Sequence, residues 1–292
     1  MSIRKLTVLF GFFLLLSPAV YSQRFSVNIG GGMMNYGGDL QESVFTFNQA
    51  NKAFEAGISY KLSDYFSIDA SIITGKLAAS DAKTNTERAR RNLSFYTNLT
   101  EENLTLKFDL KQVPELFKFT PYIFGGVGLY QFNPYAYNTV EQKVYLQPLS
   151  TEGEGLQLYP ARKPYKLTQF SIPFGGGITY AISDKVMISG EVAFRKLFTD
   201  YLDDVSGPTY ADTAILRVEK GDLSAKMSFR SDETNNPFPF SDKLIRGNPD
   251  KKDVFYTCLI KLSFSFGSSG SSMNNWYSRK ARKQCGCPGK VL

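Results

Sequence analysis

The feature that most constrains the fold is an alternation of apolar and polar residues that recurs eight times along the chain. Successive side chains of a β-strand point to opposite faces, so a period of two predicts strands with one apolar and one polar face. Single-chain bacterial membrane barrels have an even number of strands, and eight fits this rule. The alternating runs lie at residues 25–30, 53–62, 66–72, 103–110, 122–132, 169–180, 188–195 and 256–266.

The connections between the runs are alternately short and long. Short periplasmic turns alternating with long extracellular loops are typical of outer-membrane barrels, whereas a soluble sandwich has no reason to sort its loops in this way. The sequence therefore predicts an all-β fold, an eight-stranded antiparallel transmembrane up-and-down β-barrel. Alternation alone does not show which face is outward, so a soluble barrel filled by its apolar faces is the alternative. The short connections are 63–65, 111–119 and 183–185, and the long ones are 41–52, 81–92, 133–166 and 205–253.

The N-terminus predicts export. Two basic residues precede the apolar run Leu6–Leu16, and Val20 and Ser22 suit the −3 and −1 positions of a cleavage site. This pattern is typical of a secretory signal peptide, and the run is shorter than the ~20 residues of a spanning helix. We expect residues 1–22 to be removed, the mature chain to begin near Gln23, and the protein to reside in the outer membrane of a Gram-negative cell.

Composition argues against several function classes. The chain has no histidine, which removes His-based catalytic triads and nearly all zinc sites. Its three cysteines are too few for a disulfide scaffold, and its net charge of +7 is spread along the chain rather than gathered into a nucleic-acid surface. We therefore expect no enzyme activity, no cofactor and no nucleic-acid partner, with membrane lipid as the surroundings of the barrel.

Charged residues on the polar faces predict a closed lumen. An eight-stranded barrel is just wide enough for its own side chains, and a buried charge without a partner is costly. We therefore expect a structural ion-pair lattice, which Glu191 and Arg195 suit because they lie two steps apart on the same face; a proton or ion path is the alternative. The predicted lattice residues are Glu55, Lys61, Asp69, Lys107, Asp109, Glu191, Arg195 and Lys261.

Two further groups of charges stand out. Asp200, Asp203 and Asp204 follow the seventh run, and we interpret them as a solvated rim, with a Ca²⁺ site as the alternative. Residues 268–292 form a flexible basic tail after a barrel of residues 23–267. The tail is either a periplasmic docking segment, with its aromatic residues at an interface, or a solvated terminus.

Several stretches together resemble the PorG-like outer-membrane barrels of Bacteroidota. The resemblance covers most of residues 25–266 and implies an eight-stranded barrel. For the best-known member it implies a component of the type IX secretion system, associated with a periplasmic ring of a lipoprotein and its partner; a paralogue is the alternative. The stretches are GKLAASD, RARRNLSF, FTPYIFGGVGLYQFNP, LQPLSTEGEGL, FSIPFGGGITY and FRKLFTDYLDDVSGPTY.

The resemblance implies a non-catalytic anchor, whose ring contacts we expect on the short-turn side and the tail. A surface interaction or adhesion barrel acting through 133–166 and 205–253 is the first alternative, and a small channel or carrier for an apolar ligand is the second. The expected ring-contact residues are Pro114, Glu115, Lys118, Trp276, Tyr277, Arg279, Lys280, Arg282 and Lys283.

Overall fold

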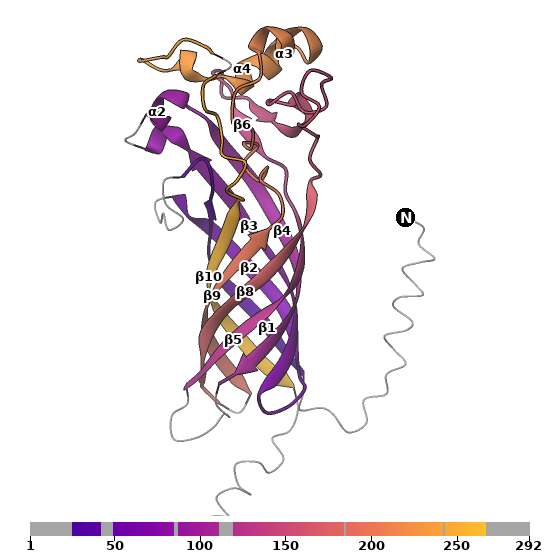
Figure 1. The fold of residues 1–292 in the computed structure, drawn as a ribbon. Helices are drawn as coiled ribbons and strands as arrows, with labels where there is room; N and C mark the ends of the chain where they lie inside the picture. Colours follow the sequence, from indigo (N-terminus) through magenta and orange to yellow (C-terminus); the bar gives the residue numbers. More distant parts are fainter. Residues whose placement is uncertain are drawn as a thin grey trace, which may run out of the picture.

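The computed structural model shows a tall β-barrel with a folded cap at one end (Figure 1). Eight strands lie side by side in the order β3-β2-β1-β10-β9-β8-β5-β4, and the pairing of β3 with β4 closes the sheet. The predicted eight-stranded antiparallel barrel is therefore confirmed. The predicted signal peptide and tail lie outside the described part of the chain. The structure describes residues 25–266 except 42–48, 85–86, 111–118, 184 and 242.

All eight predicted runs are strands, and most of them extend further toward the cap than the alternation indicated. The bounds are β1 (Phe25–Gly37), β2 (Asn51–Lys61), β3 (Phe66–Ser80), β4 (Ser94–Asp109), β5 (Phe119–Gln131), β8 (Thr168–Ala181), β9 (Val186–Leu197) and β10 (Val254–Phe266).

The barrel exterior is apolar around its lower part, which we define as the part nearer the short turns. Phe54 is 59% exposed on β2, and Ile123 and Ile260 are similarly exposed on β5 and β10. Their polar neighbours in sequence point into the lumen. A soluble protein rarely exposes a continuous apolar belt of this kind, so the alternative of a soluble barrel filled by its apolar faces is wrong.

The polarity of the two faces reverses toward the cap. On β4, Leu104 faces outward and Asn103 is buried in the lumen, as predicted. Four residues further along the strand, roughly 13 Å, Leu99 is buried inside while Thr100 and its outward neighbour Asn98 are exposed outside. This reversal explains why the sequence placed the start of the fourth strand too late. Before residue 103 the apolar residues change to the other face of the strand, so the apolar face followed from Leu104 onward ends there.

The long connections fold into the cap, which the sequence treated as loops. Helices α3 and α4 lie at its top, and a small hairpin of β6 and β7 extends the sheet beyond β4 (Figure 1). No helix in the described ranges is long and apolar enough to cross a membrane. The cap elements are η2 (Asp81–Lys83), α2 (Arg88–Arg91), β6 (Tyr135–Tyr137), β7 (Lys143–Tyr145), η3 (Gln147–Leu149), α3 (Thr213–Glu219), α4 (Asp222–Ser228) and η4 (Ser231–Glu233).

Candidate functional site

The middle of the lumen is occupied by a lysine between two carboxylates. Nζ of Lys261 lies 2.8 Å from Oε1 of Glu55 and 2.8 Å from Oε1 of Glu191. The hydroxyl of Tyr122 donates to Oε2 of Glu191 at 2.8 Å. These four side chains come from β2, β5, β9 and β10, so their contacts span the barrel and join strands that are not all neighbours.

A second buried ion pair lies closer to the cap. Nε of Arg195 donates to Oε2 of Glu101 at 2.9 Å, and the two side chains are only 1% and 0% exposed. Glu101 also accepts from Ser171 at 2.7 Å, and Arg195 donates to Thr257 at 2.7 Å. Asn103 adds a further donor to Glu101 at 3.0 Å. Both charges are therefore neutralised and held by a network from four strands.

The partner of Arg195 differs from the sequence interpretation. Four residues along a strand separate side chains by roughly 13 Å, so Glu191 and Arg195 share a face without meeting. Glu101 was missing from the predicted lattice because it lies above the point at which the fourth run was placed. The sequence did contain a sign of it: Glu101 lies two residues before Asn103, so both side chains point to the same side of the strand, into the lumen.

The remaining predicted lattice residues divide into interior and rim positions. Lys107 and Asp109 pair at 3.4 Å, and Lys107 also lies 4.4 Å from the centre of the Tyr122 ring. Asp69 lies inside, where Oδ1 is buried and accepts no hydrogen bond within the described chain. Lys61 does not belong to the lattice: its side chain is 50% exposed and pairs with Asp64 at 3.4 Å. Because β2 ends at Lys61, its long side chain reaches water at the rim.

Above Arg195 the lumen is filled by apolar and aromatic side chains. Met34, Leu99 and Tyr130 are fully buried there, and the Tyr130 and Phe255 rings meet edge to face at 5.8 Å. The Arg195 guanidinium lies 5.2 Å from the centre of the Phe255 ring. An aromatic plug thus rests directly on the ion-pair layer, and together they close the barrel.

The described residues of four connections between barrel strands form the cap, and we call these connections its first to fourth segments: 38–50, 81–93, 132–167 and 198–253. Two buried arginines join the four segments. Arg91, at the end of α2, makes a bidentate pair with Asp81 at 2.6 and 2.8 Å. It also donates to the backbone oxygens of Asp39 and Arg246, which belong to the first and fourth cap segments. A single guanidinium therefore joins three segments, which suits the planar fork of donors that arginine provides.

Arg246 connects the fourth segment to the third. It pairs with Glu152 and donates to Thr151 at 3.1 Å. Glu152 in turn accepts from the backbone N–H groups of Ser206 and Gly207 at 3.0 and 2.7 Å. These contacts fold residues far apart in sequence into one body with its own polar core.

The acidic residues after the seventh strand are buried, so the prediction of a solvated rim is wrong. Asp203 is 1% exposed, and both it and Asp253 lie against the hydroxyl of Tyr36, which lies at the cap end of β1. Burial, then the Asp253 charge, raises the pKa of Asp203 well above its usual range. The cap covers this end of the barrel, and the sequence carried no signal for that covering.

A second set of buried acids lies around Arg246. Asp204 accepts from Tyr165 and Thr151, each at 2.5 Å, and burial raises the pKa of Asp204 to about 6. Burial, then the charges of Asp204 and Glu152, raises the pKa of Glu154 to about 8. At neutral pH Glu154 therefore keeps its proton for most of the time. Among the buried charged side chains of the cap, acids outnumber bases, and protonation relieves part of that excess.

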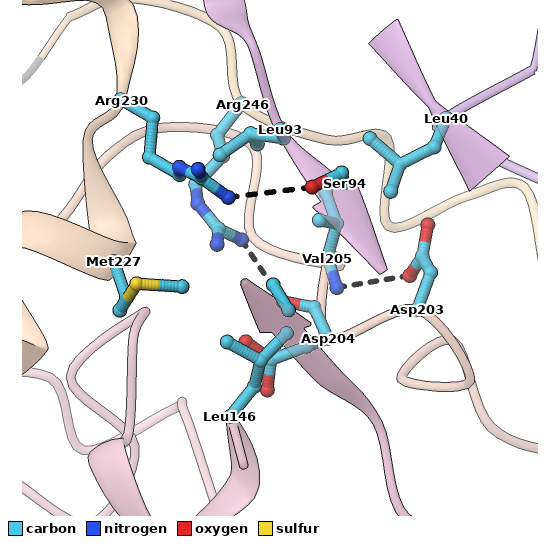
Figure 2. Close-up of a pocket in the computed structure, with 11 residues that line it drawn as sticks. Leu40, Leu93, Ser94, Leu146, Asp203, Asp204, Val205, Met227, Arg230 and Arg246 are labelled. Atoms are coloured by element: carbon cyan, nitrogen blue, oxygen red, sulfur yellow. Dashed lines mark hydrogen bonds between the residues drawn. The ribbon is translucent and has the colours of Figure 1, made fainter. Parts of the chain in front are cut away.

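A small cavity lies in the cap and is drawn in Figure 2. Its volume is about 10 Å³, which is room for a single water. Figure 2 shows its lining, where Arg230 donates to Ser94, Arg246 donates to the backbone of Asp204 and the N–H of Val205 donates to Asp203. Across the described ranges, no three His, Cys, Asp or Glu residues are placed to hold a metal ion. The cavity is too small for an organic ligand.

The residues expected to contact a periplasmic ring all lie outside the described part of the chain, which omits 111–118 and everything beyond 266. Their arrangement stays a prediction. They are Pro114, Glu115, Lys118, Trp276, Tyr277, Arg279, Lys280, Arg282 and Lys283.

Comparison with solved structures finds small outer-membrane barrels at very low identity. Neisserial surface protein A is 7% identical over 83% of this chain and 97% of that one, with a TM-score of 0.43. Ail of Yersinia pestis, in complex with a heparin analogue, is 8% identical over 84% and 99%, with a TM-score of 0.40. The N-terminal barrel domain of Pseudomonas aeruginosa OprF is 10% identical over 82% and 97%, with a TM-score of 0.34. Likenesses of this size bear on no activity or partner.

No curated protein matches the chain. A family model does match it over residues 4–229, which include most of the predicted signal peptide, most of the barrel and much of the cap. The protein therefore belongs to the family described as a domain of unknown function, DUF6089.

Proposed function

We propose that the protein is a non-conducting outer-membrane anchor that presents a rigid, folded cap to macromolecules outside the cell. The observation that carries this proposal is the reversal of polarity along the barrel. Apolar side chains face outward on the lower part and inward toward the cap. A barrel embedded in lipid below and surrounded by water above requires this arrangement.

The closed lumen supports an anchor rather than a channel. Lys261 bridges two carboxylates across the middle, and the Arg195–Glu101 pair and the aromatic plug lie above it. Passage of an ion would require separating pairs that are nearly free of solvent, which is strongly unfavourable. The cap adds support for a surface role, because long connections with their own buried core are uncommon unless they carry function.

The test has two readouts on the full-length mature protein. Planar-bilayer recordings of the reconstituted protein should show no steady conductance, and cells should lose binding to their external partner surface when 133–166 and 205–253 are replaced by short turns. A matched variant that shortens only the solvent-exposed turn of β6 and β7 should keep binding. Open-channel currents in the wild type, or unchanged surface binding after loop replacement, would contradict the proposal.

A more specific role as a type IX secretion anchor is a second candidate, favoured by the sequence resemblance to PorG-like barrels. In this role the short-turn side and the tail bind a periplasmic ring lipoprotein and its partner. Pull-down from detergent extracts should recover these proteins with the full chain and lose them when the chain is truncated after Gly267. A loop-replaced chain, which keeps the tail, is the control. If the truncated chain recovers as much of the ring proteins as this control, the tail has no docking role, and the anchor proposal is unaffected.

A further inference from the structure

Two lysines stand next to each other on the outer surface of the barrel, just above its apolar belt. Ala53 pairs with Gly75 in the register of β2 and β3, so Lys52 and Lys76 occupy the next positions toward the cap. Both face outward, since their inward neighbours Ala53 and Leu77 are fully buried. Side chains at directly opposed positions of antiparallel strands lie about 5 Å apart at Cβ.

No carboxylate among the described residues forms an ion pair with either lysine. Like charges at opposed positions destabilise a sheet, yet neither lysine forms an ion pair with any described residue. Nζ of Lys76 lies 4.9 Å from the centre of the outward-facing Tyr96 ring. The outward carboxylate of Glu102 is paired in register with Ile72, four residues from Lys76 toward the short turns. The two lysines therefore place two positive charges on neighbouring strands of this outer surface, which an anion between them would relieve.

The surroundings of the pair grade from polar to apolar along the barrel. Asn98 pairs with Lys76 in register, and the hydroxyls of Thr74 and Thr100 lie 3.4 Å apart on the next outward row toward the short turns. Phe54 shares that row and is exposed beside them. A molecule that fits this face carries an anionic group, then hydrogen-bonding groups, then hydrocarbon.

We propose that Lys52 and Lys76 bind a phosphate of the phosphorylated glycolipid that forms the outer leaflet of the outer membrane. The phosphate lies between the two ammonium groups, Asn98 and the threonines face the sugar, and acyl chains run down past Phe54. This inference rests on the proposed function, because it requires the cap to lie outside the cell. Lysine is a common point-charge partner for phosphate, and basic residues next to a membrane surface strengthen binding to anionic headgroups.

The experiment uses the full mature protein in detergent micelles and measures binding of purified lipid A by native mass spectrometry. The wild type should bind bisphosphorylated lipid A about ten-fold more tightly than the dephosphorylated form. The double variant Lys52→Ala, Lys76→Ala should lose most of this preference. Lys196→Ala is the matched control: it removes an exposed, outward lysine at the cap end of β9 whose register partners Ile172 and Val254 are apolar. It should keep at least half of the preference.

The outcomes separate this site from the proposed function. Equal binding by the double variant and the wild type, or no preference for the phosphorylated lipid, would overturn the site while leaving a membrane-inserted, non-conducting barrel. Displacement of the lipid by 10 mM inorganic phosphate, a concentration on the order of ordinary buffers, would show a free-anion site and overturn the lipid assignment. A mature protein that stays soluble without detergent would instead overturn the proposed function itself.

Discussion

Replacing Arg195 with methionine should destabilise the barrel far more than its loss of volume explains. The substitution keeps a long side chain in the lumen but leaves Glu101 buried and without its counter-charge. Glu101 is 0% exposed, so water cannot replace the guanidinium. Breaking one partner of a buried pair costs about 3–5 kcal/mol, because an uncompensated charge stays in the interior.

The double variant Arg195→Met, Glu101→Leu is the decisive comparison. It removes both charges and leaves Ser171 and Thr257 with hydroxyls that lose one partner each. Replacing a whole buried pair by apolar side chains is often close to neutral, so the double variant should recover at least half of the loss. The exposed pair of Lys61 and Asp64 provides the control, and Lys61→Met should change the stability by less than about 1 kcal/mol.

The assay is urea unfolding of the refolded barrel in detergent, followed by circular dichroism and by the gel mobility shift between folded and unfolded forms. The free energies of unfolding give the coupling between the two positions. If the single and double variants are destabilised equally, the pair contributes no mutual neutralisation and the reasoning is refuted. If Lys61→Met costs as much as Arg195→Met, burial is not the cause.

Three further perturbations follow. The cap should loosen as pH rises from about 4 to about 8: Glu154 and Asp204 have raised pKa values of about 8 and about 6, so the folded cap holds protons that the unfolded form releases. Hydrogen exchange, corrected for its intrinsic pH dependence, should show this loss, and equal or greater protection at pH 8 would contradict it. Gly128→Leu should destabilise the barrel by about 1–3 kcal/mol, since a Cβ there would lie 2.5 Å from both Asn103 Oδ1 and Ser171 Oγ, whereas Gly190→Ala meets nothing within 4 Å; equal urea midpoints for the two variants would argue against crowding. Arg246→Ala should expose the α3–α4 region to proteases while the barrel keeps its gel mobility, and an intact cap would show that Glu152 does not depend on its buried partner.

The sequence predicted the barrel because lipid imposes a simple rule on it. Every spanning strand must present apolar residues to lipid, so eight runs such as Leu104–Leu110 repeat the same signal. The outward direction was also recoverable, through the lengths of the connections. The strand ends near the cap were not recoverable in this way, because around Thr100 the outward side chains are polar and the inward ones are apolar.

The lumen was predicted in part. Parity placed Glu55, Glu191 and Lys261 inside, and their ion pairs follow from the closeness of the walls. The alternation shows which face a residue lies on, but it does not show the level of that residue along the barrel axis. That level depends on how the strands are staggered around the barrel. Height decides that Arg195 meets Glu101 and that Lys61 reaches the rim.

The cap is the part that sequence reasoning missed, and the reason is physical. Its contacts join residues that no local period relates, as when Arg91 reaches the backbone of Arg246 and Arg246 reaches Glu152. An acid in a long polar loop is most often solvated, so Asp203 and Asp204 were assigned to a rim. They are buried because other loops close over them, and that covering depends on the pairing of distant segments.

The cap is fixed to the end of the barrel by buried contacts, and this limits how the protein can work. Tyr36 is the last inward-facing aromatic of β1, and its hydroxyl lies against Asp203 and Asp253 of the fourth cap segment. The same ring packs on Phe95 of β4 at 4.9 Å. A cap that swung open as a lid would strip a buried phenol and two buried carboxyls of their partners, each at a cost comparable to a lost buried hydrogen bond. Motion at this junction is therefore unfavourable, and a rigid cap is suited to binding at its surface rather than to admitting a ligand through it.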